Sequence, residues 1–314
     1  MPSTLVTVVI PIFNQAEFVV ETVGSAVRQT CRDLQIVVVD DGSTDGSADR
    51  LAAEFGDRIV LLRQKNGGPS AAINAGIAAA TGSFIALLGG DDVCVDDRMD
   101  IQLEIMRTTS HDIVFSKPLL IDGSGQPLDD ASFPVFFDER PDQPLLRTLL
   151  LEGNFLCAPT AFMRREAVQK VGWFRPGLIQ LQDYDYWLRA AAAGLSLAET
   201  GPRVVKYRRH SANLSSPRAS FASTAESIPI FKSVLDTGGA AEFRRAFPYL
   251  FEPVADPATP LTRFDKALFL LSHPRDEMRM IGVEYLVALS EDPAFLAKAE
   301  SFGLNLPRFV QNAL

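Results

Sequence analysis

The sequence predicts an α/β protein: a mostly parallel central sheet flanked by helices, with an all-α appendage at its C-terminal end. Three observations predict this fold class. Short apolar, β-branched runs alternate with helical segments through the first hundred residues, as in βαβ units with right-handed crossovers. Polar or turn-forming residues follow these runs directly. From residue 220 onward, by contrast, the apolar residues recur at helical spacing.

The individual elements follow from these patterns. Apolar runs are typical of strands that are covered on both faces, and they predict strands at residues 5–10, 34–39, 58–62 and 84–88. Helical spacing predicts helices between them at residues 16–29, 44–55 and 69–80. After Asp92 the rhythm is less regular. It predicts helices at residues 98–107 and 183–193, and strands at residues 113–116, 159–163 and 203–207.

We place a domain boundary near residue 215, where the alternation of strands and helices ends. Residues 1–215 form the expected α/β domain and residues 216–314 the expected helical region. In that region Phe264, Leu268 and Leu271 share one helix face, which suits docking against other apolar surface. We expect the C-terminal helices to serve packing, contact with a second copy or peripheral contact with a membrane.

Composition narrows the class of protein. A formal net charge of −9 argues against a nucleic-acid binder, which needs a basic face. The three cysteines are far apart and show no CxxC spacing, which fits a reducing compartment. The start of the chain lacks the pattern of a secretory signal, and the uncharged stretch at residues 66–90 is interrupted by Asn74 and a polar turn. We therefore expect a cytoplasmic protein without a transmembrane segment.

The candidate site lies at the ends of the first four strands, because ligands of open parallel sheets bind outside the carboxyl ends of the strands. In chain order these ends carry Pro11, Phe13 and Asn14; Asp40 and Asp41; Lys65 and Gly68; and Gly89, Gly90, Asp91 and Asp92. Carboxylates suit Mg²⁺ or Mn²⁺ shared with phosphates. For Asp91 and Asp92 the alternative is that one caps the following helix and the other is solvated. For Asp40 and Asp41 it is a turn followed by the helix start at Ser43 and Asp45.

These residues resemble the inverting family 2 glycosyltransferases with a GT-A fold, of the nucleotide-diphospho-sugar transferase superfamily. Six segments carry the likeness, in order: VVIPIFN (8–14), QIVVVDDGSTD (35–45), NGGPSAAINAG (66–76), GSFIALLGGDD (82–92), QDYDYWLR (182–189) and YRRHSANLS (207–215). The resemblance implies transfer of a sugar from a nucleotide diphosphate donor, with a UDP-sugar favoured, to an acceptor hydroxyl with inversion. It places the reaction in polysaccharide or glycoconjugate biosynthesis, with a saccharide, lipid-linked or protein acceptor.

The resemblance also implies a donor-binding role for the strand ends. Phe13 and Asp41 are expected to face the nucleobase, and Asp40 and Lys65 the base or ribose. Asp91 is the expected ligand of Mn²⁺ or Mg²⁺, joined by His210 from the closing loop. The remaining residues expected around the donor are Pro11, Asn14, Gly68 and Gly90. A lone histidine is otherwise more often a surface or capping residue.

Asp183 is the expected general base that takes the proton of the acceptor hydroxyl. Tyr184, Tyr186 and Trp187 beside it are expected to offer flat surfaces that stack on sugar rings. Asp185 is the rival for the same role. The alternative interpretation of Asp183 is an acid stabilised by the helix macrodipole at a helix N-terminus.

Two positions depart from the family pattern. Gly89 stands at the first acidic position of the Asp-x-Asp metal motif, and Ile73 stands where many relatives have an arginine. Both favour an alternative, a catalytically silent binding or scaffold protein with the same fold. A sugar-nucleotide pyrophosphorylase would need a glycine-rich loop after the first strand, and a dinucleotide dehydrogenase would need G-x-G-x-x-G there. The sequence has Pro11, Phe13 and Asn14 at that place instead.

Overall fold

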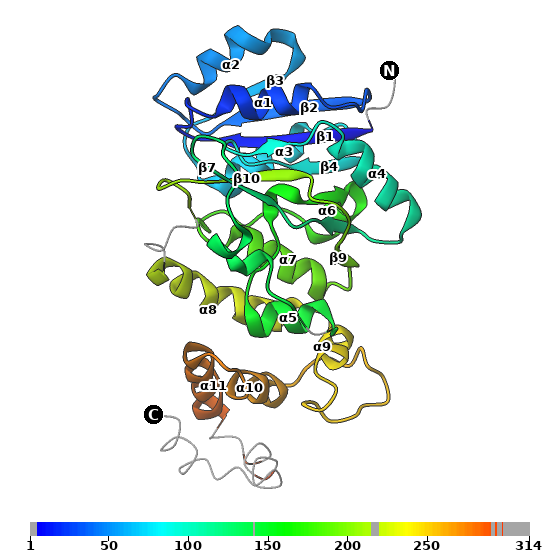
Figure 1. Ribbon diagram of the computed structural model, residues 1–314. Coiled ribbons are helices and arrows are strands. Elements are labelled where there is room, and N and C mark those ends of the chain that lie inside the picture. Colours follow the sequence, from blue (N-terminus) through cyan, green and yellow to red (C-terminus); the bar gives the residue numbers. More distant parts are fainter. Residues whose placement is uncertain (1–4, 141, 215–219, 290–292, 294–296, 298–314) are drawn as a thin grey trace. The chain divides into compact units, whose positions relative to one another are not determined.

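The computed structural model describes residues 5–140, 142–214 and 220–289, with Pro293 and Ala297 (Figure 1). Within these residues a seven-stranded sheet forms the centre of the fold. Its order is β3 (Val60–Arg63), β2 (Leu34–Asp40), β1 (Val6–Ile12), β4 (Phe84–Leu87), β8 (Phe162–Arg164), β6 (Ile113–Phe115) and β9 (Leu197–Glu199). Neighbouring strands are parallel except at β8, which is antiparallel to β4 and β6. The predicted fold class is confirmed.

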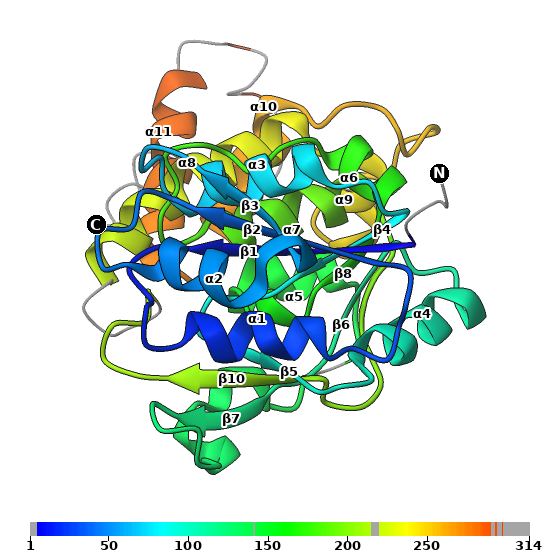
Figure 2. The ribbon, with the colours of Figure 1, turned by 90° about the horizontal axis from the view of Figure 1, so that it is seen from above.

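Helices cover both faces of the sheet. On one side of β1–β3 lie α1 (Val19–Val27) and α2 (Ser47–Phe55), and on the other lies α3 (Pro69–Ala79), as Figure 2 shows. Alternate β1 side chains, such as Val8 and Ile10, belong to the same buried cluster as Val23 of α1. On the opposite face, a β-carbon on Gly76 of α3 would lie 2.3 Å from Cγ1 of Val9, so only glycine allows this close packing.

A second, three-stranded sheet lies beside the end of β4. It consists of β5 (Val93–Cys94), β10 (Val205–Arg209) and β7 (Leu119–Asp122), with β10 in the middle. Strand β10 pairs antiparallel with β5 and parallel with β7. Because β5 directly follows Asp91 and Asp92, this pairing brings residues near position 208 to the acid pair. The sequence did not predict β5, β7 or β9, which are two to four residues long.

Several predicted boundaries were wrong by a few residues. The helices expected at 16–29 and 44–55 begin at Val19 and Ser47. The Asp45 carboxylate accepts hydrogen bonds from the backbone N–H of Ala16 (2.8 Å) and Ser47 (3.0 Å), which stabilises non-helical chain before both starts. The strand expected at 159–163 is a 3-10 helix at Ala158–Thr160 followed by β8, and the strand expected at 203–207 is β10.

Helices α4 (Arg98–Thr108), α6 (Arg165–Val171) and α7 (Gln182–Ala192) complete the first of two compact units, which comprises Met1–Pro141, Asn154–Ala191 and Leu195–Ala219. The second comprises Asp142–Gly153, Ala192–Gly194 and Ser220–Leu314. It contains α5 (Leu145–Glu152), which the sequence did not predict, α8 (Ser220–Thr237), α9 (Ala240–Ala246), α10 (Arg263–Leu271) and α11 (Asp276–Leu289). The boundary near residue 215 stays a prediction.

The second unit has its own apolar core. Phe264 and Leu271 of α10 are buried with Leu286 and Leu289 of α11, and Leu268 packs against them. The shared face expected from their spacing is therefore used in packing. Among the described residues, no helix combines the length and the apolar character needed to cross a membrane.

Candidate functional site

The loops after β1 and β2 are fixed to one another by side-chain hydrogen bonds. Asn14 Oδ1 accepts the backbone N–H of Thr44 at 2.8 Å, and Ser43 Oγ accepts the N–H of Asn14 at 2.9 Å. Asn14 has a φ of 51°, in the left-handed region that asparagine tolerates better than most residues. Phe13, beside it, is 47% exposed. The loop thus presents an aromatic ring to solvent at the carboxyl end of β1.

Asp41 organises the loop that follows β3. Its Oδ1 accepts hydrogen bonds from Nε2 of Gln64 (2.7 Å) and the N–H of Gly67 (2.9 Å), and its Oδ2 accepts the N–H of Gly68 (2.8 Å). The side chain is buried, whereas Lys65 in the same loop is exposed. Asp41 is therefore largely occupied by its own chain, and a nucleobase contact stays a prediction.

Asp40 has the simpler environment. It is buried, and its Oδ1 accepts the N–H of Ser43 at 3.1 Å. Between the acids and the next loop the chain approaches itself closely, since a β-carbon on Gly42 (φ 82°) would lie 2.9 Å from the N atom of Asn66. The loops after β1, β2 and β3 are consequently held to one another along one edge of the sheet, called the tied edge below. This edge contains the residues of these three loops that are predicted to bind the sugar donor.

The second acid pair is completed by residues far along the chain. Nε2 of His210 lies 2.9 Å from Oδ2 of Asp91, and Nδ2 of Asn213 lies 3.3 Å from the same oxygen. The ring of Phe18 packs on the imidazole with centroids 4.8 Å apart. Gly90 allows the loop to approach β1, because a β-carbon there would lie 3.0 Å from the carbonyl oxygen of Pro11. The two residues predicted as metal ligands are thus neighbours.

Asp92 is a structural partner of strand β10. Its side chain is 1% exposed, and Oδ1 accepts the backbone N–H of Arg208 at 2.9 Å. Burial, and next the nearby charge of Asp91, raise the pKa of the Asp92 carboxyl well above its usual range. The carboxyl is consequently a weak candidate for a solvent-facing ligand.

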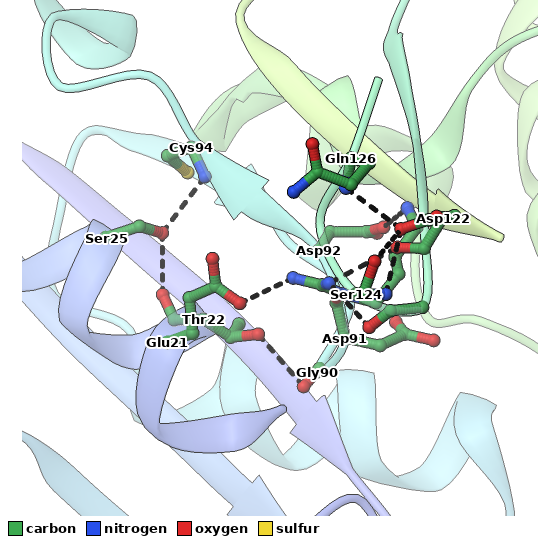
Figure 3. A network of polar contacts seen from close by, with 12 residues as sticks. Glu21, Thr22, Ser25, Gly90, Asp91, Asp92, Cys94, Asp122, Ser124 and Gln126 are labelled. Carbon is green, nitrogen blue, oxygen red and sulfur yellow. Dashed lines mark hydrogen bonds and ion pairs between the residues drawn. The ribbon is translucent and has the colours of Figure 1, made fainter. Parts of the chain in front are cut away.

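Figure 3 shows the polar network around Asp91 and Asp92, and the hydrogen bonds of Arg208 make it part of this network. Its Nε donates to the carbonyl oxygen of Asp91 at 2.7 Å, its Nη2 pairs with Glu21 at 2.6 Å, and its Nη1 donates to the carbonyl of Gly123 at 3.1 Å. The guanidinium also lies 5.0 Å from the ring centroid of Phe18. A buried arginine with these partners holds the loops around Asp91 together.

Asp183 lies in the first turn of α7 and is half-buried. Its Oδ2 accepts a hydrogen bond from Nδ2 of Asn154 (2.9 Å), and its Oδ1 accepts the N–H of Tyr184 (2.8 Å). Burial raises the pKa of Asp183 to about 6, and these two hydrogen bonds limit the rise. An acid with this pKa is ionised at neutral pH yet basic enough to accept a proton. No pattern in the sequence predicted a role for Asn154.

Asp185 has a different environment. It is fully buried, with Oδ1 2.9 Å from Nη1 of Arg175 and Oδ2 2.9 Å from Nε of Arg189. Both of its oxygens are used in ion pairs inside the protein. Of the two rivals, Asp183 is therefore the better placed to meet a substrate.

The prediction that the aromatic residues of α7 stack on sugar rings was wrong. Tyr184, Tyr186 and Trp187 are at most 2% exposed. Tyr186 stacks on Phe174 with ring centroids 4.0 Å apart, and Trp187 meets the edge of Phe115 at 4.7 Å. These side chains lie on the face of α7 that packs into the core, where burial of large aromatic surface stabilises the fold.

The thiol of Cys157 is influenced by the charges of both Asp92 and Asp183. The thiol is buried, and burial raises its pKa well above the usual value, with further rises from the negative charges of Asp92 and Asp183. Both acids consequently lie within electrostatic reach of one side chain. Ile73, at the position of the family's arginine, is buried in α3 and offers no polar contact.

The donor set around Asp91 fits a cation that shares its ligands with phosphate. In the part of the chain that the structure describes, no group of three or more His, Cys, Asp or Glu side chains could hold a metal. Asp91 and His210 nevertheless offer one carboxylate and one imidazole side by side. Hard cations are commonly bound by one or two carboxylates with phosphate oxygens from the substrate.

Comparisons with known proteins found a family model, sequence relatives and solved structures of similar fold. The family model described as glycosyl transferase family 2 matches residues 7–172, ahead of Asp183 and His210. An uncharacterised glycosyltransferase of Rickettsia conorii is 33% identical over 193 residues, 59% of this chain and 31% of the relative. Another, from a Nostoc strain, is 34% identical over 172 residues, 53% of this chain and 52% of the relative. The matches thus span about a third to a half of these two relatives.

Solved structures show the same fold at low sequence identity. TarS of S. aureus, residues 1–349 in complex with UDP-GlcNAc, has a TM-score of 0.60 and 17% identity, and the likeness covers 85% of this chain and 71% of that 1–349 chain. The mannosyltransferase PcManGT of Pyrobaculum calidifontis, in complex with GDP-Man and Mn²⁺, has a TM-score of 0.53 and 16% identity. That likeness covers 98% of this chain and 85% of PcManGT.

Proposed function

The chain belongs to glycosyl transferase family 2, and on this premise we propose that it transfers a sugar, with inversion, from a UDP-sugar to an acceptor hydroxyl. Mn²⁺ or Mg²⁺ would assist, and the product would enter polysaccharide or glycoconjugate biosynthesis. The observation that carries the proposal is the convergence of Asp91 and His210 at the carboxyl end of β4. Ligands of parallel sheets bind at this edge.

The choice of UDP rests on fold likeness. TarS, described with UDP-GlcNAc and with UDP, aligns with TM-scores of 0.60 and 0.56, and the GDP-Man complex of PcManGT with 0.53. On the tied edge, Phe13 would stack on the base, and Asp40, Asp41 and Lys65 would face base or ribose. Pro11, Asn14, Gly68 and Gly90 would shape the pocket.

Asp91 and His210 would hold the cation together with the diphosphate of the donor. A bound Mn²⁺ or Mg²⁺ would offset the negative charge that develops on the departing nucleoside diphosphate. Arg208 and Asn213 support this pair, since one bonds the Asp91 carbonyl and the other its carboxylate. The metal requirement follows from this donor set and is a proposal for this chain.

Asp183 would serve as the base. The acceptor oxygen attacks the anomeric carbon from the side opposite the diphosphate, the bond from that carbon to the diphosphate oxygen breaks, and the hydroxyl proton passes to the Asp183 carboxylate. Its pKa of about 6 suits this role near neutral pH. Direct attack with one base gives inversion, because the new bond forms on the face opposite the leaving group.

We extend the proposal to the setting of the reaction. The enzyme would act in the cytoplasm on a saccharide, lipid-linked or protein acceptor, and its C-terminal helices would contact the inner face of the membrane or a second copy. Met280 and Val287 support such contact, because they are seven residues apart on α11 and 62% and 58% exposed.

A donor screen tests the proposal. Melting temperatures would be measured with UDP-sugars and GDP-sugars, each with and without Mn²⁺; a ligand at 100 times its Kd adds about 2.7 kcal/mol of stability. We expect the largest shift with a UDP-sugar plus Mn²⁺, and slow hydrolysis of that donor. Absence of any shift would refute the proposal. Donor binding without hydrolysis or transfer would favour the catalytically silent scaffold, the alternative that Ile73 and Gly89 support.

A further inference from the structure

The space beside Gly89 is filled by the acid pair that follows it. A β-carbon placed on Gly89 would lie 2.5 Å from Oδ2 of Asp92 and 3.0 Å from Oδ1 of Asp91. It would also lie 3.3 Å from Cγ of Asp92, so more than the tip of that side chain is in the way. A side chain at position 89 therefore requires the Asp92 carboxylate to shift.

The place of Asp92 is set by strand β10. Its Oδ1 accepts the backbone N–H of Arg208, and the Nε of Arg208 returns a hydrogen bond to the carbonyl of Asp91. These two bonds tie residues 91–92 to β10 in both directions. Two residues beyond Arg208 stands His210, whose ring meets Asp91. Asp92 therefore fixes the strand that delivers the imidazole.

We propose that Asp92 is the positioning residue of the Asp91–His210 site, and that Gly89 is required to give it room. The inference rests on the proposed function, since it concerns how this chain holds the cation and the diphosphate. The glycine at the first position of the Asp-x-Asp pattern is then needed for the packing of Asp92, and it does not mark a lost metal ligand. Adding an acid at position 89 weakens metal binding instead of strengthening it.

The effect of a side chain at position 89 follows from the contacts. The Asp92 carboxylate must shift away from the new β-carbon, and we expect this shift to break or weaken the hydrogen bond that its Oδ1 accepts from the buried N–H of Arg208. An unpaired buried N–H destabilises the arrangement enough to shift an affinity by about tenfold. The attachment of β10 to the loop after β4 loosens, and His210 and Asn213 no longer both contact Oδ2 of Asp91.

The test measures Mn²⁺ binding by electron paramagnetic resonance in the presence of saturating UDP, using the full chain. We expect about tenfold weaker Mn²⁺ binding in Gly89→Ala and in Gly89→Asp than in the wild type. Asp92→Asn retains an oxygen acceptor for Arg208 and is expected to stay near the wild type. Gly123→Ala is the matched control, because a β-carbon there meets nothing closer than 3.8 Å.

A double-mutant cycle separates positioning from general damage to the fold. Once Asp92→Ala has removed the main clash, adding Gly89→Ala is expected to cost much less than in the wild type, because only the approach to Oδ1 of Asp91 at 3.0 Å remains, so the two effects do not add. Additive losses, or unchanged or tighter Mn²⁺ binding in Gly89→Asp, would overturn the positioning role alone. If the wild type binds no Mn²⁺ with UDP, the metal part of the proposed function fails and this inference falls with it. Melting temperatures confirm that each variant is folded.

Discussion

The two acid pairs of the sheet look alike in the sequence but are built differently. The carboxylates of Asp40 and Asp41 accept hydrogen bonds from groups nearby in the sequence, and Asn14 is bonded to Ser43 and Thr44 in the same region. In all of these bonds the partners are 3 to 30 residues apart. Asp91 and Asp92 are completed by residues 116 to 122 positions away on β10 and its following loop. The first pair holds loops that are close in the sequence, whereas the second joins two parts of the chain that are far apart in the sequence.

This difference suggests a division of labour. The polar side chains in the loops after β1, β2 and β3 are hydrogen-bonded within these loops. The loops can therefore keep their conformation without a ligand, which suits donor binding. Where β10 meets the loop after β4, the β4–β10 junction, the half-buried carboxylate of Asp91 lies beside the imidazole of His210. The charges of Asp92 and Asp183 both raise the pKa of the Cys157 thiol. We expect substitutions at the first region to change donor affinity, and substitutions at the second to change metal use and chemistry.

The largest expected effect is at Asp183. Asp183→Asn retains the size of the side chain but cannot accept a proton, so we expect transfer to fall by roughly 10²–10⁴-fold. Donor affinity, measured by calorimetry, is expected to stay unchanged because the donor edge is untouched. Asp185→Asn is the control: loss of its ion pairs with Arg175 and Arg189 should lower the melting temperature more than the rate of the folded enzyme. Near-normal turnover in Asp183→Asn would assign the base elsewhere.

The next largest effect is expected at Asp91. Asp91→Ala removes the carboxylate that lies 2.9 Å from Nε2 of His210, so the gain in UDP affinity on adding Mn²⁺ should disappear. A charge-assisted contact of this kind corresponds to roughly 10- to 100-fold in affinity. Affinity without metal should hardly change, since we expect the loops after β1, β2 and β3 to bind the nucleotide independently of the cation. An unchanged Mn²⁺ response would move the ligand assignment to another residue.

A smaller effect is expected at the first acid pair. In Asp41→Asn, the amide can accept through one oxygen only, so either Gly67 or Gly68 loses its partner and the loop bearing Lys65 loosens. We expect UDP to bind about tenfold more weakly, with the same dependence on Mn²⁺ as the wild type. Calorimetry with and without Mn²⁺ checks both points. A lost Mn²⁺ response would break the division between the two regions.

The sequence predicted the first region better than the second, for a physical reason. Strands β1, β2 and β4 are apolar runs buried on both faces, and their ends must meet at one edge, so Asp40 and Asp91 could be placed from the pattern alone. Strand β5 has two residues and β10 pairs with strands far away in sequence, which local spacing cannot predict. The roles of Asp92, Arg208 and Asn154 depend on that pairing or on contacts between distant loops.

The error at α7 has a similar origin. Tyr186 and Trp187 carry polar atoms and stand beside an acid, which favoured a surface role in the sequence. Their faces on the helix, however, are set by the packing of α7 against Phe174 and Phe115, and both of these are buried. Which side of a helix faces the core depends on the neighbouring elements, and a helix with acids and aromatics interleaved leaves that choice open.

The smallest expected effect is the pH dependence of transfer, and it tests the second region without a mutation. Asp183 must be ionised to accept a proton, and burial raises its pKa from the usual 3.8 to about 6, so the reactive fraction falls as the pH drops through 6. Between pH 7.5 and pH 5.5 we expect kcat/KM for the acceptor to fall roughly fourfold, and by tenfold per unit at lower pH. Saturating donor and Mn²⁺ keep the metal site occupied during the titration. The residual rate of Asp183→Asn should lack this inflection, because its amide does not titrate. An inflection near pH 4 would mean that water reaches the carboxylate in the complex and that burial does not tune the base.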